Sequence, residues 1–174
     1  MAIEIRPARP SEYPETGDLT RRAYVEFAPP GDEGWQGYLD ELADAAGRAK
    51  RALVLVAVED SAILGTATIE LARRIDPEDP PLRPEEAHIR MVGVDPAARG
   101  RGIGRALMEA CLAEARARGK TLVTLHTTKW MTAAQRMYES MGFVRGPDRV
   151  FESGFRLMSY SLPIGEVSSG QEAR

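Results

Sequence analysis

The sequence predicts a single mixed α/β domain, and three observations lead to that fold class. The chain has 174 residues, a length typical of one domain with one sizeable core. Its hydrophobic patterns alternate between strand and helix periods, in the order strand, two helices, three strands, helix, strand, helix, two strands. One strand–helix–strand unit, over residues 88–127, requires its two strands to lie parallel in the sheet.

The N-terminal third is predicted to contain one short strand and two helices. Residues 3–6 alternate between apolar and polar side chains, as strands do. Ser11 is a suitable N-cap for a helix that continues to about Phe27. Residues 28–32 contain helix breakers and form a loop. Apolar residues at helical spacing indicate a second helix over residues 35–48.

Three strands are predicted in the middle of the chain. Residues 52–58 are an almost continuous apolar run, which indicates a strand covered on both faces. A turn leads into a second strand over 62–71, so the two form a hairpin. Residues 73–86 contain four prolines and can be neither helix nor central strand, and a connection of this length is often functional. The third strand covers 88–94.

The C-terminal half is predicted to alternate between helices and strands. Its helices cover 102–118 and 134–141, and each has one apolar face and a glycine just past its end. The strands are 121–127, 144–152 and 155–162, the last two as an antiparallel pair. The domain is therefore expected to span residues 1–162, and the polar residues 163–174 form a loosely held tail.

Composition and charge exclude several classes of protein. The chain carries 23 basic and 26 acidic residues, and the net charge of −3 argues against a nucleic-acid-binding protein. One cysteine cannot form an intramolecular disulfide, and with two histidines we expect no metal site. Cys111 lies on an apolar helix face and is interpreted as a buried hydrophobic residue. Neither a signal peptide nor a stretch of about 20 apolar residues is present, so we expect a cytoplasmic protein with no membrane partner.

The most informative stretch is residues 92–107, VGVDPAARGRGIGRAL, which passes from a strand through a glycine-rich turn into a helix. A helix start offers free N–H groups and partial positive charge, and glycines let a phosphate approach the backbone. Arg99, Arg101 and Arg105 add positive charge. The stretch lacks the third small residue of a dinucleotide fingerprint and the lysine of a P-loop. The sequence therefore predicts a pyrophosphate-binding turn of another kind.

This turn resembles the acyl-CoA signature R/Q-x-x-G-x-G/A of the GNAT (GCN5-related) N-acetyltransferase superfamily, with Arg99, Gly102 and Gly104 at the signature positions. Residues 134–143, AQRMYESMGF, resemble that superfamily's second motif, A-x-x-x-Y-x-x-x-G-F. The resemblance covers about residues 3–162 and includes the order of the elements. It implies a GNAT-like fold whose two parallel strands splay apart to admit acetyl-CoA. It also implies transfer of the acetyl group to an amine through a tetrahedral intermediate.

The resemblance implies which residues hold acetyl-CoA, with the phosphates on the glycine-rich turn and the pantetheine on the strand before it. The expected set is Val92, Gly93, Val94, Arg99, Gly100, Arg101, Gly102, Ile103, Gly104, Arg105, Met131, Ala134 and Tyr138. Met131 stands where the family commonly has an asparagine, and a thioether cannot make a strong hydrogen bond. The contact made by that asparagine is either missing or supplied by Thr127, Thr128 or Thr132.

Three further positions are candidates for proton transfer. Tyr138 matches the tyrosine that the family often uses as general acid toward the departing thiolate, since a phenol stays protonated at neutral pH. His88 stands where protein-modifying members often have a glutamate, and a histidine with an ordinary pKa is a competent base at neutral pH. Glu70 is the second candidate base. His126 is the third, and it is interpreted more readily as a pocket residue.

The acceptor side of such enzymes is built from the first two helices, their connection and the last hairpin. Here these elements contribute Tyr24, Phe27, Trp35 and Tyr38, which with His126 form the expected substrate-binding set. Aromatic side chains suit a cationic amine, although the same residues are equally typical of a core.

We therefore expect an acetyl-CoA-dependent N-acetyltransferase that acts on a primary amine of a small molecule. Acetylation of a protein N-terminus or a lysine is the alternative enzyme, and His88 in place of the glutamate disfavours it slightly. A non-catalytic acyl-CoA-binding sensor is the alternative outside the enzymes, and Met131 keeps it open. Many members of the family dimerise, so a homodimer also remains open.

Overall fold

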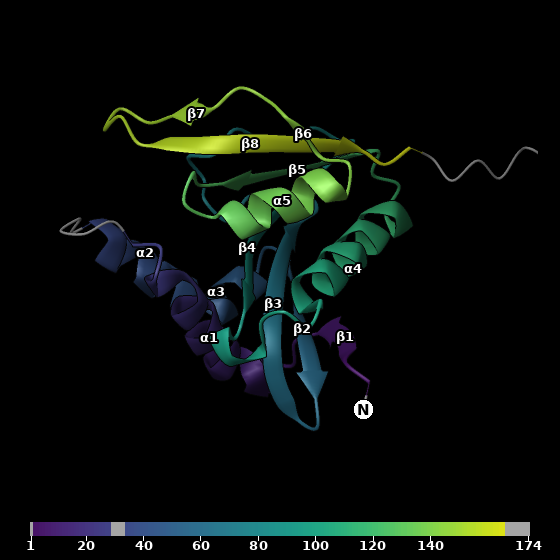
Figure 1. The fold of residues 1–174 in the computed structure, drawn as a ribbon. Coiled ribbons are helices and arrows are strands. Elements are labelled where there is room, and N and C mark those ends of the chain that lie inside the picture. Colours follow the sequence, from purple (N-terminus) through teal and green to yellow (C-terminus); the bar gives the residue numbers. More distant parts are fainter. Residues whose placement is uncertain (1, 29–33, 166–174) are drawn as a thin grey trace, which may run out of the picture.

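The computed structural model describes residues 2–28 and 34–165, and its strands form one mixed sheet. The sheet order is β1–β2–β3–β4–β5–β8–β6, with β7 paired to β8 alone (Figure 1). The strands are β1 (Glu4–Pro7), β2 (Leu53–Glu59), β3 (Ala62–Glu70), β4 (Glu86–Val94), β5 (Leu122–Thr127), β6 (Val144–Arg145), β7 (Arg149–Val150) and β8 (Arg156–Pro163). The predicted mixed α/β class is confirmed.

Helices cover both faces of this sheet. They are α1 (Tyr13–Val25), α2 (Gly34–Ala43), α3 (Ala45–Ala49), α4 (Ile103–Ala117) and α5 (Thr132–Ser140). Leu19 of α1 packs on Val56 and Val58 of β2, whereas α4 packs on the alternate residues Leu55 and Ala57. Because neighbouring side chains of a strand point to opposite faces, α1 and α4 lie on opposite sides of the sheet. The core between α4 and the sheet contains Cys111, which is fully buried as predicted.

The strands β4 and β5 run parallel, as the strand–helix–strand unit predicts, but they pair over a short distance only. Their register runs from Glu86 opposite Leu122 to Ile89 opposite Leu125. β4 then continues to Val94 without β5 beside it. In Figure 1 the strands β2–β4 run down the view, whereas β5 and β8 run across its top. The sheet therefore opens between β4 and β5.

A bulge in β4 lies directly after the last paired residues. Met91 has a φ of 57°, which is uncommon for a bulky side chain. Met91 and Val92 together lie opposite Ala67, because the register with β3 shifts between Thr66 and Thr68. A bulge of this kind bends a strand and increases its local twist. The bulge accounts for the divergence of β4 from β5. No glycine or other turn residue at this position predicts the bulge from the sequence.

Three boundaries differ from the sequence-based expectation in the N-terminal half. The predicted helix over 35–48 is two helices, because the Asp44 carboxylate accepts a hydrogen bond from Gly47 N–H at 2.9 Å and caps α3. Ser11 is not an N-cap, since it lies inside a 3₁₀ turn, Pro10–Glu12, that precedes α1. β4 begins two residues earlier than expected, at Glu86. The predicted loop over 28–32 lies mostly outside the described residues.

Two expectations about the C-terminal end are corrected. The predicted strand over 144–152 is two strands of two residues each, β6 and β7. Pro147 lies between them, and it has no N–H for a ladder. The tail does not begin at residue 163, because β8 includes Pro163 and Ile164 N–H donates to Thr121 O at 2.9 Å. Residues 166–174 lie outside the described chain.

Candidate active site

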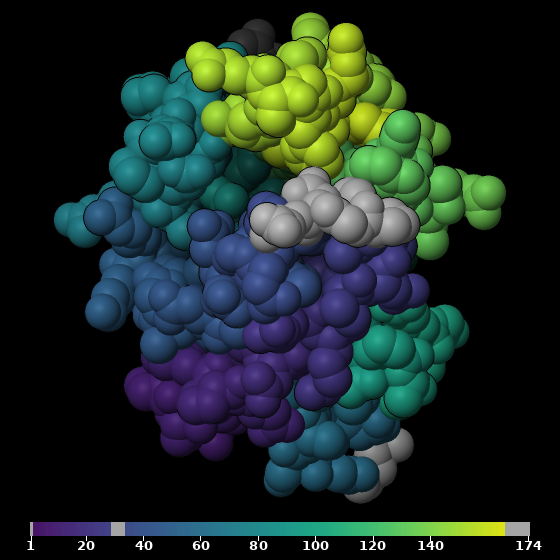
Figure 2. Space-filling view, turned by 90° about the vertical axis from the view of Figure 1, so that its left-hand side faces the viewer, coloured from purple at the N-terminus to yellow at the C-terminus, as the bar shows by residue number. Residues whose placement is uncertain are grey.

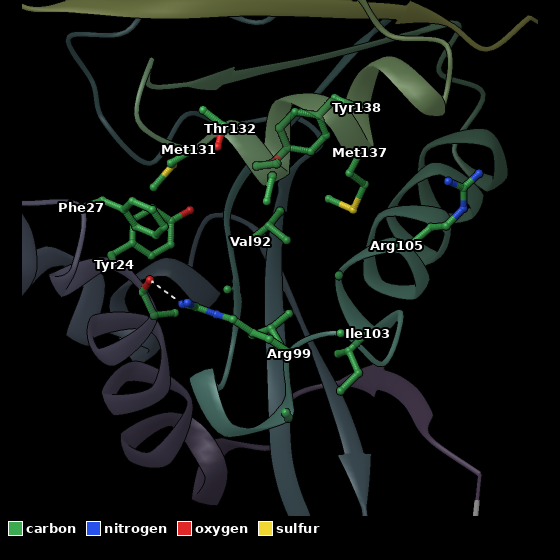
Figure 3. Close-up of a pocket in the computed structure, with 18 of the residues that line it drawn as sticks. Tyr24, Phe27, Val92, Arg99, Ile103, Arg105, Met131, Thr132, Met137 and Tyr138 are labelled. Carbon is green, nitrogen blue, oxygen red and sulfur yellow. Dashed lines mark hydrogen bonds between the residues drawn. The ribbon is translucent and has the colours of Figure 1, made fainter.

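A cleft of about 400 Å³ lies at the opening between β4 and β5. The end of α1, the start of α4 and the helix α5 form its walls (Figure 3). Of the thirteen residues expected to hold acetyl-CoA, twelve line this cleft: Val92, Gly93, Val94, Arg99, Gly100, Gly102, Ile103, Gly104, Arg105, Met131, Ala134 and Tyr138. The one that does not line it is Arg101.

The glycine-rich turn forms the lower end of the cleft. Gly100 and Gly102 have φ values of 79° and 77°, which side chains rarely adopt, and Gly102 is the N-cap of α4. A Cβ at either position would have no protein atom within 4 Å, so open space adjoins the backbone there. The first N–H groups of α4 have no partner within the helix. This turn therefore has the room and the donors that a diphosphate requires.

The three arginines of the turn differ in where they point. Arg99 extends across the cleft to α1, where it donates to Ala23 O at 3.4 Å and pairs with Glu26 (Figure 3). Arg105 borders the cleft and contacts Ser140 Oγ at 3.1 Å. Arg101 Nη2 instead donates to both carboxylate oxygens of Glu59 of β2, at 2.9 Å each. The turn therefore contributes Arg99 and Arg105 to the cleft, and Arg101 lies on the neighbouring surface.

The middle of the cleft suits an extended arm that carries amide groups. Beyond Ile89, β4 has no pairing with β5, so one edge of its backbone faces the opening. Val92 lies at the centre of the view in Figure 3, below Met137 and Tyr138 of α5. An apolar wall with a free strand edge matches the pantetheine of acetyl-CoA, and the turn matches its diphosphate. The residues present therefore fit acetyl-CoA.

Tyr138 projects from α5 into the cleft (Figure 3). Its side chain packs against Phe143 and Tyr160, with ring centroids 5.9 and 6.0 Å away. Burial raises the pKa of Tyr138 well above its ordinary value. Among the described residues its hydroxyl has no hydrogen-bond partner, and the hydroxyl oxygen is not completely buried. The cleft thus holds a protonated phenol whose O–H is available to a ligand.

Met131 is the N-cap residue of α5 and lines the cleft, as expected. Its sulfur accepts a hydrogen bond from Thr127 Oγ1 at 3.5 Å, so that hydroxyl is engaged with Met131 and does not line the cleft. Thr128 is buried and does not line the cleft either. Thr132 is the one of the three threonines that does, and it is the candidate for the contact of the missing asparagine.

His88 lies outside this cleft, in a polar group on the face of the sheet opposite α4. Its Nδ1 is 2.7 Å from Thr124 Oγ1, and that hydroxyl donates to Glu86 Oε1 at 2.7 Å. Burial lowers the pKa of His88 well below its usual 6.5, and the charges of nearby arginines and His126 lower it further. His88 is therefore a neutral imidazole at pH 7. Sequence reasoning missed Thr124 and Glu86, although both share a strand face with a candidate residue at a spacing of two.

Glu70, the second candidate base, is fully buried and heavily engaged. Its carboxylate accepts hydrogen bonds from Arg74 at 3.0 Å and from the backbone N–H of Ile75. Arg90 lies 3.8 Å from the same carboxylate and pairs with Asp79 at 3.1 Å, and Asp79 also pairs with Arg149. Glu70 therefore anchors the loop 71–85 to β3, and Asp79 anchors the same loop to β4 and β7.

Figure 2 shows a hollow on this face of the molecule, bordered by the teal loop of residues 71–85, the blue helix α2 and the yellow-green β7–β8 hairpin. Tyr24 and Phe27, expected to bind the acceptor, line the cleft on the α1 side. Trp35 is buried and packs edge-to-face against Tyr38, with ring centroids 5.2 Å apart, and neither lines the cleft.

His126 also stands apart from the cleft, with its ring centroid 5.0 Å from that of His88. Burial is the main cause that lowers the pKa of His126, to about 4. Sequence reasoning missed five further cleft residues: Ala23, Ala98, Trp130, Ala133 and Met137. The helical spacing of Met137 from Ala134 could have indicated Met137, because the two lie on one face of α5.

The comparisons with known proteins agree with this geometry. The family model described as "Acetyltransferase (GNAT) family" matches residues 17–143. Mycothiol acetyltransferase from Thermobispora bispora is 53% identical over 57 residues, which are 33% of this chain and 19% of that protein. The chain thus matches about a fifth of the length of this curated relative.

Two solved structures share the fold over nearly the whole chain. The ribosomal-protein-S18-alanine N-acetyltransferase from Escherichia coli has a TM-score of 0.68 at 22% identity, and 99% of each chain is covered. A GNAT family acetyltransferase from Brucella melitensis, in complex with acetyl-CoA, has a TM-score of 0.62 at 24% identity, covering 94% of this chain and 89% of that one.

Proposed function

Because this chain belongs to the acetyltransferase (GNAT) family, we propose that it transfers the acetyl group of acetyl-CoA to a primary amine of a small molecule. One observation carries the proposal: the cleft at the opening of the sheet joins a helix start suited to a diphosphate to a buried, protonated tyrosine. A sensor of acyl-CoA would require the first of these features but has no use for the second.

The chain's own residues would bind the donor along the cleft. The N–H groups at the start of α4, with Arg99 and Arg105, would hold the diphosphate. The free edge of β4 at Val92–Val94 would hydrogen-bond to the amide-bearing arm. When bound, acetyl-CoA supplies an acetyl group on a thioester, which an amine can attack, and a thiol as leaving group.

Two residues would move protons. The Tyr138 hydroxyl would donate to the departing sulfur, and its buried O–H is available for this. His88 would accept a proton from the acceptor's ammonium group, directly or through a water, because its imidazole is neutral at pH 7. Glu70 is the weaker candidate for the base, since Arg74 and the Ile75 N–H already occupy its oxygens.

The loop 71–85 supports a small acceptor in preference to a protein. Asp79 joins this loop to Arg90 of β4 and to Arg149 of β7, and the side chain of Asp79 is 9% exposed. The loop therefore borders the hollow in Figure 2 on one side and is anchored to both strands. A loop fixed in this position limits the room for an extended peptide, whereas a small amine needs less space. The name of the partly matching relative, mycothiol acetyltransferase, points the same way.

Release of free thiol from acetyl-CoA across a panel of small amines and short peptides tests the proposal. We expect release that depends on an added small amine, with peptides bearing a free N-terminus or lysine giving at most a tenth of that rate. Faster turnover with peptides would favour the protein-modifying alternative. Tight binding of acetyl-CoA without release on any amine would favour the sensor.

A further inference from the structure

We infer that Thr124 and Glu86 are positioning residues that fix His88 in the tautomer whose Nε2 is free to accept a proton. The tautomer itself follows from the hydrogen bonds between these three residues. Its use in catalysis rests on the proposed function.

The inference starts at Glu86. Its burial raises the pKa of this carboxyl, but hydrogen bonds from Thr124 and from Arg83 outweigh burial and hold the pKa below its ordinary value. Glu86 is therefore ionised at neutral pH, and an ionised carboxylate can only accept hydrogen bonds. The other oxygen, Oε2, faces the backbone N–H and the guanidinium of Arg83, at 3.3 and 3.4 Å.

The single hydroxyl proton of Thr124 then decides the rest. It is donated to Glu86 Oε1, at 2.7 Å, so Thr124 Oγ1 has only lone pairs to offer His88. The 2.7 Å contact between Oγ1 and His88 Nδ1 must therefore be donated by the ring. A neutral imidazole carries one proton, which places it on Nδ1 and leaves a lone pair on Nε2.

The position of Nε2 is consistent with use as a base. The His88 side chain makes no hydrogen bond other than the one to Thr124 within the described part of the chain. Across the described residues, three side-chain atoms are completely buried and lack a hydrogen-bond partner: Arg48 Nε, Thr68 Oγ1 and Thr128 Oγ1. His88 Nε2 is not among them, so this atom is not completely buried, although the residue as a whole is 3% exposed.

The charges around His88 explain why this support is needed. Glu70 of β3 lies opposite it in the sheet, but Arg74 and Arg90 neutralise that carboxylate. His126 of β5, Arg90 of β4 and Arg149 of β7 oppose a positive charge on the ring, as does Arg74. Asp79 of the loop 71–85 is paired with Arg90 and Arg149.

Glu86, acting through Thr124, is thus the carboxylate that is linked to the ring by hydrogen bonds. In the proton transfer, an N–H bond of the acceptor's ammonium group breaks and the Nε2–H bond of His88 forms. Nδ1 keeps its proton throughout, and Glu86 remains ionised. The hydrogen-bonded chain orients the ring before the transfer and stabilises the imidazolium after it.

Nuclear magnetic resonance of the ¹⁵N-histidine-labelled protein at pH 7.5 tests the inference without requiring turnover. We expect the His88 signals to show a protonated Nδ1 and an unprotonated Nε2. In Thr124→Val the hydroxyl is lost at nearly constant volume, so the tautomers should mix or invert. Thr124→Ser, the matched control, should retain the wild-type pattern.

Activity provides the second readout. On whichever amine the enzyme accepts, kcat/KM should fall about tenfold or more in Thr124→Val and recover in Thr124→Ser, with the KM for acetyl-CoA unchanged. A proton on Nε2 in the wild type would overturn the inference, and so would a Thr124→Val protein with unaltered tautomer and kcat/KM. If no amine is acetylated, the proposed function fails while the spectra still decide the tautomer.

Discussion

The proposed role of the buried Tyr138 hydroxyl, donation of a proton to the departing sulfur, depends on when charge develops on that sulfur. Burial keeps the phenol protonated throughout the physiological range. Negative charge on a departing sulfur appears only on the way to products, so the interaction strengthens in the transition state. Tyr138→Phe removes the oxygen and little volume. We expect kcat to fall by about 10²–10⁴, with little change in the KM for acetyl-CoA, in steady-state kinetics. An unchanged kcat would assign Tyr138 to packing alone.

As the proposed base, His88 would give kcat/KM a pH dependence that differs from that given by an exposed histidine. An unperturbed imidazole would give a rise in rate near pH 6–7. Burial lowers the pKa of His88, so the base is already neutral at pH 6.5, and the rising limb of kcat/KM should lie well below that pH. His88→Gln cannot accept the proton, and it should lower kcat/KM and abolish this acidic limb. If the profile of His88→Gln overlays that of the wild type after scaling, the base is another group.

At the scale of elements, the start of α4 depends on a backbone conformation that only glycine adopts easily. Gly102→Val would place a branched side chain at a φ of 77° and in the open space beside the turn. We expect calorimetry to show at least a tenfold loss of acetyl-CoA affinity, with the far-ultraviolet circular dichroism retained.

Gly119 offers the matched control for this variant, since it follows the other end of α4 with a φ of 71° and equally open surroundings. Gly119→Val carries the same backbone strain away from the cleft. It should lower the melting temperature and leave acetyl-CoA affinity intact. Equal losses of affinity in both variants would show that strain, and not the phosphate contact, is responsible.

The elements also show what sequence patterns can and cannot predict. Helix α4 and the loop after β3 were predictable because apolar periodicity and clustered prolines act locally. The bulge at Met91 was not, since methionine has no preference for a positive φ and only the surrounding sheet enforces it. The turn of Arg101 toward Glu59 depends on a strand more than 40 residues away in sequence, which no local pattern records. The splay itself was expected from family resemblance alone.

For the molecule as a whole, the two histidines make folding sensitive to acid. The pKa of His126 is lowered to about 4 and that of His88 is also well below 6.5, whereas both titrate near 6.5 in the unfolded chain. The unfolded state therefore binds more protons below pH 6.5, and the free energy of unfolding falls as the pH falls. Urea unfolding should give a level stability from pH 8 to about 6.5 and a decline toward pH 4.5. His126→Asn should flatten that decline, and equal stability at pH 7.5 and 5 would contradict this account.

The two halves of the sheet are joined by four residue pairs between β4 and β5. In one half, β4 pairs with β3, and in the other half, β5 pairs with β8. The two halves should separate most easily at this short junction, because few backbone hydrogen bonds have to break there. A molecule bound in the opening would contact both halves of the sheet and hold them together. Hydrogen exchange at Val92–Val94 and along β5 should therefore slow together when acetyl-CoA is present, which would make the ligand part of the sheet's own architecture.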